Sequence, residues 1–150
     1  MAKKVSSMSL VKKLLIVASA LLSLFLIFVG VMVVKNYIAI QPYKKLATEL
    51  NETLGGGYRI SYNWNCGLET TNCPSARMIK DANFKDNEEA QALFLSYTDK
   101  MKANNYTTQG ISICEPRAGF EVYCAMNAKK DNLSITINAK KDFIGIDIQP

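Results

Sequence analysis

Four cysteines are the residues of this chain whose type and spacing bear most directly on chemistry: Cys66, Cys73, Cys114 and Cys124. Paired zinc thiolates are usually separated by about two to four residues, whereas six and nine residues lie between the cysteines here. An even set in a small domain is typical of disulfides formed in an oxidising compartment. Three pairings are formally open. Loop-closure entropy favours Cys66–Cys73 and Cys114–Cys124 over crossed pairings that close longer loops, so we expect two local disulfides and no structural metal.

Other residue types argue against catalysis. The chain has no histidine, which is the commonest general base near neutral pH. Paired cysteines would leave no thiolate nucleophile, and no Cys-x-x-Cys redox motif occurs. Gly55-Gly56-Gly57 precedes an expected strand and no Lys-Ser/Thr follows it, so a phosphate-binding loop is not indicated. We therefore expect a protein that is not an enzyme and has no cofactor.

An uncharged apolar segment dominates the N-terminal third. Leu14 to Val34 comprises twenty-one residues without a charge, and a helix of that length rises about 31 Å against a hydrocarbon core of about 30 Å. A signal peptide is the alternative, since Ala18-Ser19-Ala20 has the small-x-small form of a cleavage site. Cleavage there would leave an apolar N-terminus on the product. An uncleaved single-pass anchor is the prediction.

The distribution of charge predicts the orientation. Residues 1–13 contain four lysines and no acidic residue, and all four cysteines follow the apolar segment. The positive-inside rule and the cysteines together place the N-terminus in the cytoplasm and the domain outside it, with the membrane contacted through Leu14 to Val34. From Lys35 onward 14 basic residues face 13 acidic ones, a net charge of +1. The pI near 9.0 thus reflects the anchor and does not indicate nucleic-acid binding.

The expected organisation has four parts: a basic tail (1–13), a transmembrane helix (14–34), a helical stem with a Gly-rich turn (35–57), and an extracytoplasmic domain (58–150). Leu46, Leu50 and Leu54 form a stripe in the stem, which indicates packing against the domain's own sheet; a self-association stalk is the alternative. Pro42 predicts a kink or break near Gln41, because proline removes a backbone donor.

The domain reads as α+β. Residues 58–64 alternate like a half-buried strand, 66–82 read as a disulfide-stapled loop, and a capping box formed by Asp86 and Glu89 begins a helix that stops at Asn104-Asn105. Four further strands are expected at 107–114, 120–127, 133–139 and 143–148. Short connections make consecutive strands antiparallel neighbours. The prediction is a two-layer domain whose mainly antiparallel sheet has one or two helices on one face.

A candidate partner-binding surface lies at the end of the chain. If 143–148 is an edge strand, its unpaired backbone groups could dock a partner beside Trp64 and the Cys66–Cys73 loop. The residues concerned are Trp64, Ile144, Ile146, Asp147 and Ile148. Lys140 to Asp142 at the strand's entrance could instead block such pairing. Tyr58, Tyr62 and Trp64 are interpreted first as core residues and second as an exposed binding strip.

Two functions fit these features. The first is a membrane-anchored interaction or accessory module of the cell envelope or surface, with a protein or envelope polymer as partner. The second rests on layout: an apolar N-terminal helix, a proline near its end, a sheet domain and a late disulfide make the chain resemble type IV pilins, which implies a structural subunit of a filament. No acidic residue lies in Leu14 to Val34, where pilins carry a glutamate. Sequons at Asn51, Asn105 and Asn132 would be glycosylation sites only in a suitable host.

Overall fold

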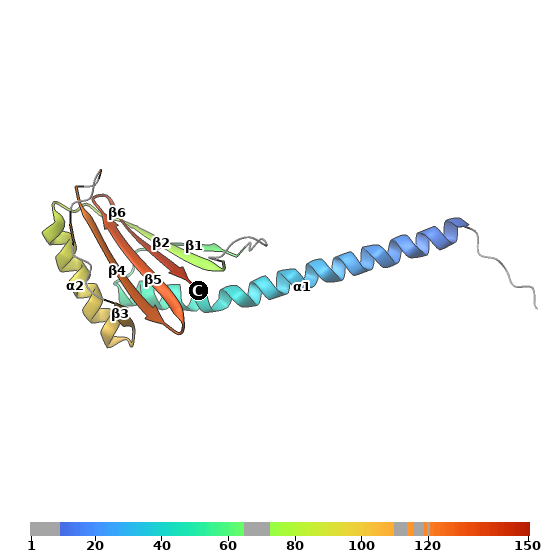
Figure 1. Cartoon of the computed structure of the whole chain (residues 1–150), viewed down its shortest axis with the longest axis horizontal. Helices are drawn as coiled ribbons and strands as arrows, with labels where there is room; N and C mark the ends of the chain where they lie inside the picture. The colour runs from blue at the N-terminus through green and yellow to red at the C-terminus, as the bar shows by residue number, and fades with distance from the viewer. Residues whose placement is uncertain (1–9, 65–72, 110–113, 116–118, 120) are drawn as a thin grey trace, which may run out of the picture. The chain divides into compact units, whose positions relative to one another are not determined.

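The computed structural model describes residues 10–64, 73–109, 114–115, 119 and 121–150. Along them the elements are α1 (Leu10–Thr53), β1 (Arg59–Asn63), β2 (Ser75–Asp81), α2 (Asn87–Ala103), β3 (Thr107–Gln109), β4 (Tyr123–Lys130), β5 (Leu133–Lys140) and β6 (Phe143–Gln149). The strands form one antiparallel sheet in the order β1-β2-β6-β5-β4-β3 (Figure 1). The α+β prediction is confirmed.

Contacts divide the chain after Lys35 into two compact units. The first unit contains the apolar part of α1, and every residue from Leu10 to Lys35 is exposed. By length and composition this helix could cross a membrane. A signal sequence near the N-terminus would have the same properties.

Helix α1 is continuous from Leu10 to Thr53, with Pro42 inside it. The predicted break near Gln41 is therefore wrong. Pro42 has no N–H to donate to the carbonyl of Ile38, but both residues lie on the exposed side of α1, where water can replace the missing bond. The side-chain amide of Gln41 donates to the Tyr37 carbonyl one turn earlier at 3.1 Å. These conditions allow an interior proline without helix termination.

The second unit buries one face of the rest of α1. Leu46, Leu50 and Leu54 all belong to the hydrophobic core, which confirms packing within the domain and leaves none of the three for a stalk. The helix then ends in Gly55-Gly56-Gly57, whose φ angles of 93°, 74° and 85° favour glycine. The turn is held by the Tyr58 N–H, which donates to Asn51 Oδ1 at 3.1 Å.

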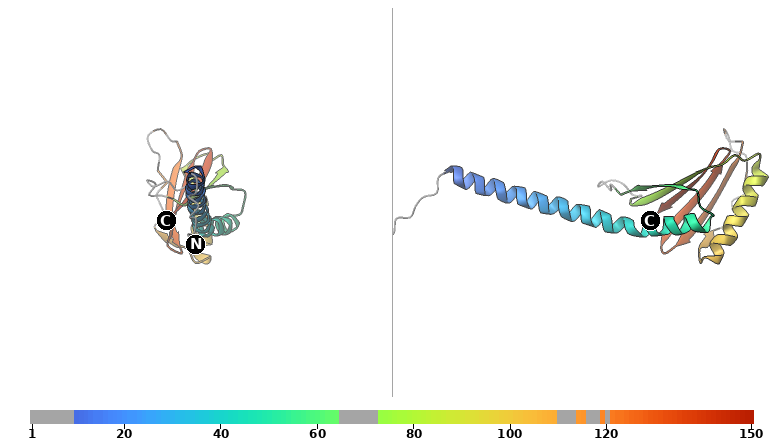
Figure 2. Two further views of the ribbon diagram at one scale, coloured as in Figure 1. Left: turned by 90° about the vertical axis from the view of Figure 1, so that its right-hand side faces the viewer. Right: turned by 180° about the vertical axis from the view of Figure 1, so that it is seen from behind.

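Helix α2 has the predicted ends. The Glu89 N–H donates to Asp86 Oδ1 at 2.9 Å, as in a capping box. Glu89 Oε2 accepts at 2.9 Å from the N–H of Lys85, the residue before the cap, instead of from that of Asp86. The helix stops at Asn104, followed by Asn105 at φ 63°. Its buried residues are Ala90, Phe94, Tyr97, Thr98 and Met101. Helix α2 packs against β3 and β4 (Figure 2).

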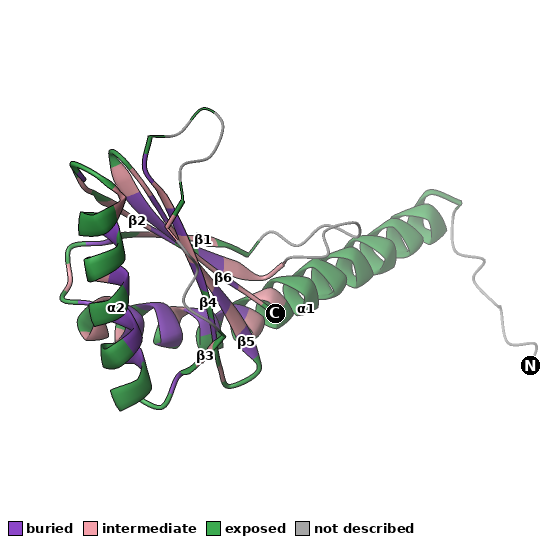
Figure 3. Ribbon diagram, turned by 60° about the vertical axis from the view of Figure 1, so that its left-hand side comes forward, coloured by how far each residue is buried: buried purple, intermediate pink, exposed green. Residues whose placement is uncertain are grey.

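The sheet has one buried face and one wetter face (Figure 3). In β5, Leu133, Ile135 and Ile137 are buried while the intervening residues are partly exposed, as the alternation predicts. A two-residue turn at Asp131 (φ 49°) and Asn132 (φ 66°) joins β4 to β5, and these angles suit a tight hairpin turn. β4 begins three residues later than expected and runs to Lys130; residues 110–113 and 120 of the predicted strands lie outside the described residues.

Two predictions about the sheet are wrong. Residues 75–81, expected to be loop, form β2, which pairs with β1 on one side and β6 on the other. Strand β6 is consequently interior and not an edge. The inward alternation of Ala76 and Met78 is interrupted by Lys80, whose ammonium donates to the Gly56 carbonyl at 2.8 Å. Because Lys80 occupies an inward position, the apolar–polar alternation expected of a strand is incomplete in residues 75–81.

Candidate functional site

A pocket of about 390 Å³ lies between α1 and β1, within the second unit. We call it the aromatic pocket, and it is lined by Tyr37, Ile40, Lys44, Ile60, Ser61, Tyr62 and Trp64. Strand β1 is the outermost strand of the sheet described here, so the pocket lies at a sheet edge.

Helical and strand periodicity bring the pocket's residues together. Tyr37, Ile40 and Lys44 lie three or four residues apart on α1, and therefore share one helix face. Ile60, Tyr62 and Trp64 alternate along β1 and its end, and therefore share one face of the strand. Ile40 is buried at the base.

Lys44 is positioned by two aromatic rings. Its ammonium lies 5.6 Å from the ring centroid of Tyr37 and 5.6 Å from that of Tyr62, distances at which cation–π attraction is effective. Among the described residues it has no carboxylate partner. The pocket therefore presents a positive charge flanked by apolar rings.

Trp64 belongs to this pocket, and both sequence interpretations of its strip are partly right. Tyr58 is 7% exposed and part of the core, whereas Trp64 is 50% exposed. Pairing between β1 and β2 ends at Asn63 with Ser75, so Trp64 lies beyond the sheet's covered face. The aromatic alternation begins in the core and ends on the surface.

The other four candidate partner-binding residues are not brought to the surface edge. Ile144, Ile146 and Ile148 are buried, at 2%, 0% and 0% exposure, in an interior strand. The Asp147 carboxylate faces the other side and lies 3.6 Å from the Arg77 guanidinium on β2. Docking through an unpaired edge of β6 is therefore wrong, because β2 already occupies that edge.

The cysteines in the described part of the chain form disulfides. Cys114 and Cys124 form a disulfide with a Cα–Cα distance of 4.3 Å, as predicted. Cys73 is also disulfide-bonded, while Cys66 lies outside the described residues. No group of three potential metal ligands occurs among the residues that the structure describes.

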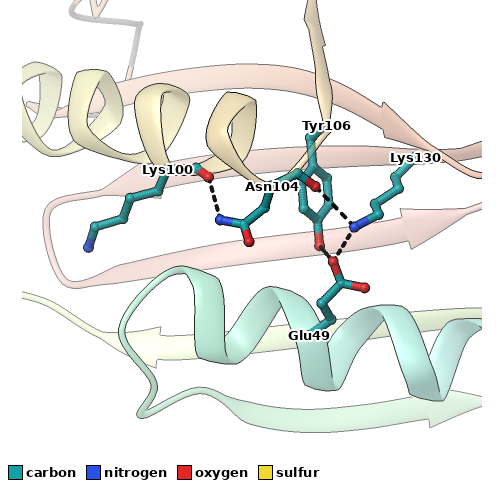
Figure 4. Close-up of polar contacts among 5 residues, drawn as sticks. All are labelled: Glu49, Lys100, Asn104, Tyr106 and Lys130. Atoms are coloured by element: carbon teal, nitrogen blue, oxygen red, sulfur yellow. Dashed lines mark hydrogen bonds and ion pairs between the residues drawn. The ribbon is translucent and has the colours of Figure 1, made fainter.

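A polar cluster connects α1, α2 and the sheet (Figure 4). The Lys130 ammonium pairs with the Glu49 carboxylate and donates to the Asn104 carbonyl at 3.1 Å. It also lies 4.3 Å from the ring centroid of Tyr106, whose hydroxyl donates to Glu49 Oε1 at 3.3 Å. Burial, and then the charge of Glu49, raise the pKa of Tyr106. This cluster is satisfied by its own members, which indicates a structural role.

Comparison with models of protein families, with curated proteins and with solved structures found no match to this chain.

Sequence reasoning had identified Trp64 but not its partners Tyr37 and Lys44. A usable signal existed, since Tyr37 and Lys44 are seven residues apart and therefore lie two turns apart on one face of a helix. The sequence prediction considered only the leucine stripe, Leu46, Leu50 and Leu54, which follows another face of this segment.

Proposed function

We propose that this chain is a single-pass membrane protein whose small domain serves as an interaction or accessory module of the cell envelope or surface. It acts without catalysis. The observation that supports the proposal concerns the apolar part of α1. The rest of the chain buries none of its most apolar stretch. An apolar surface of that size in water requires a covering, and a lipid bilayer provides one.

Charge and cysteine chemistry support the orientation. The lysines before the apolar segment favour a cytoplasmic N-terminus. The Cys114–Cys124 disulfide is typical of a domain outside the reducing cytoplasm. The domain then lies on the extracytoplasmic side.

A cell-fractionation experiment tests this topology. Membranes washed with alkaline carbonate should retain the protein, and its intact mass should include residues 1–34. Protease added to the outer side should remove the domain and spare the N-terminal lysines. A mature N-terminus at Leu21 would instead identify a cleaved signal peptide, and a protected domain would reverse the orientation.

A second candidate is a structural subunit of a filament. The observation that favours it is the continuity of α1, which contributes its apolar half to one unit and core residues to the other. Exposed apolar helices of several copies could cover one another. Mechanical shearing of cells should release the protein in high-molecular-mass assemblies if this function is right; complete retention in the membrane fraction would exclude it.

A further inference from the structure

Two of the exposed large apolar side chains of the second unit line the aromatic pocket. Within the described residues from 36 onward these exposed side chains are Tyr37, Ile38, Trp64 and Leu95. Tyr37 and Trp64 line the pocket. Ile38 follows Tyr37 on α1 but lines a different pocket, and Leu95 lies on α2. Two exposed aromatic side chains beside one pocket of a small domain are typical of an interaction surface.

The charge around this surface is positive. Among the described residues that line the pocket, Lys44 is the one that carries a charge. Residues 35–48 contain Lys35, Lys44 and Lys45 and no acidic residue. An anionic ligand with an apolar portion is complementary to this combination.

Chain connectivity identifies the source of that ligand. Tyr37 follows Val34 by three residues in the same helix, which corresponds to an axial rise of about 4.5 Å. The polar layer of a bilayer extends about 5–8 Å beyond the hydrocarbon on each side. If Leu14 to Val34 spans the membrane, Tyr37 lies in the headgroup layer, where tyrosine and tryptophan are enriched.

We propose that the aromatic pocket binds the phosphate headgroup of an anionic phospholipid in the leaflet from which the domain emerges. The backbone of Lys44 lies about 15 Å beyond Val34 along the helix, but helical side chains tilt toward the N-terminus and the Lys44 ammonium lies 5.6 Å from the Tyr37 ring centroid. There it pairs with the phosphate. The rings of Tyr37 and Trp64 pack at the boundary between the headgroup and the acyl chains. This inference rests on the proposed membrane anchor.

Trp64 is the single tryptophan of the chain, so intrinsic tryptophan fluorescence reports on the pocket alone. The full chain is reconstituted in phosphatidylcholine vesicles with increasing phosphatidylglycerol, in which a fixed fraction of lipids carries a nitroxide quencher in the headgroup. Quenching of Trp64 should increase with the phosphatidylglycerol content.

Variants test the role of the charge. Lys44→Gln should raise the phosphatidylglycerol fraction needed for half-maximal quenching about fivefold, the equivalent of about 1 kcal/mol per basic residue at an anionic surface. Lys102→Gln removes one exposed lysine from α2, away from the pocket, and should leave that fraction unchanged. Tyr37→Ser should also weaken quenching, and near-UV circular dichroism checks that each variant is folded.

Flotation with the vesicles distinguishes a failure of the proposed membrane anchor from a failure of the proposed lipid site. A chain that fails to float overturns both the anchor and the lipid site. A chain that floats while Trp64 remains unquenched and open to acrylamide overturns the lipid site alone, and leaves the pocket facing water for a protein partner. Equal quenching at every phosphatidylglycerol content, or equal effects of Lys44→Gln and Lys102→Gln, also overturns the anionic headgroup.

Discussion

Replacing Lys130 by methionine should destabilise the domain, because its ammonium is the centre of the polar cluster. The Lys130 side chain is 17% exposed and that of its partner Glu49 is 36% exposed, so water screens the pair only partly. We assign about 1–1.5 kcal/mol to the ion pair, about 0.5–1 kcal/mol to the contact with Tyr106, and about 0.5–1 kcal/mol to the bond with Asn104. Methionine retains the packing of the lysine stem, so the expected loss is about 2–3.5 kcal/mol in the free energy of unfolding.

A double-mutant cycle isolates the ion pair. Glu49→Gln, Lys130→Met and the double variant are compared as full chains in detergent micelles, with thermal unfolding followed by near-UV circular dichroism. A domain of this size loses about 4 °C in Tm per kcal/mol, so Lys130→Met should melt about 8–14 °C lower. The coupling between the two sites should be about 1–1.5 kcal/mol.

The matched control is the ion pair between Glu121 and Lys141. Lys141 lowers the pKa of Glu121, and Glu121 raises the pKa of Lys141. Both side chains are at least half exposed, so water and salt screen the pair and the same cycle should detect no coupling. If the Glu49–Lys130 coupling is no larger than that of the control pair, partial burial does not strengthen the Glu49–Lys130 ion pair, and the predicted stabilisation by the cluster is refuted.

Three further predictions concern the core, the disulfide and pH. Ile146→Ala should lower the free energy of unfolding by about 3 kcal/mol in a denaturant titration, because Ile146 is fully buried in an interior strand; a loss below about 1 kcal/mol would contradict that position. Replacing Cys114 and Cys124 by serine should cost about 2.5–3 kcal/mol in the same titration, since it frees a short loop in the unfolded chain; an unchanged midpoint would refute this. Burial raises the pKa of Tyr58 and of Tyr97, whose hydroxyls share a hydrogen bond of 2.8 Å. The stability they contribute should therefore be complete below pH about 10 and fall as the pH rises further, with phenolate absorbance appearing together with unfolding; full ionisation of all tyrosines in a folded domain would contradict it.

The candidate site was only partly predictable. Trp64 could be selected from the sequence because a large aromatic residue ends an alternating run. Whether it lies in the core or on the surface depends on where β1 loses its neighbour β2, and on how α1 lies against β1. These are contacts between segments far apart in the chain, so no local pattern contains them. The partners Tyr37 and Lys44 were missed for the same reason.

Local sequence patterns by themselves determined the apolar segment, the buried stripe of α1, the capped helix α2 and the meander from β3 to β6. Each depends on periodicity, capping or turn chemistry within a few residues, such as the left-handed pair Asp131-Asn132. Only the tertiary structure decided that residues 75–81 form a strand, because its hydrogen bonds come from β1 and from β6 near the other end of the chain. The insertion of β2 beside β6 in turn made β6 interior and buried its isoleucines. Continuity of α1 through Pro42 was likewise decided by the structure, since a missing backbone bond ends a helix only where neither packing nor solvent compensates for it.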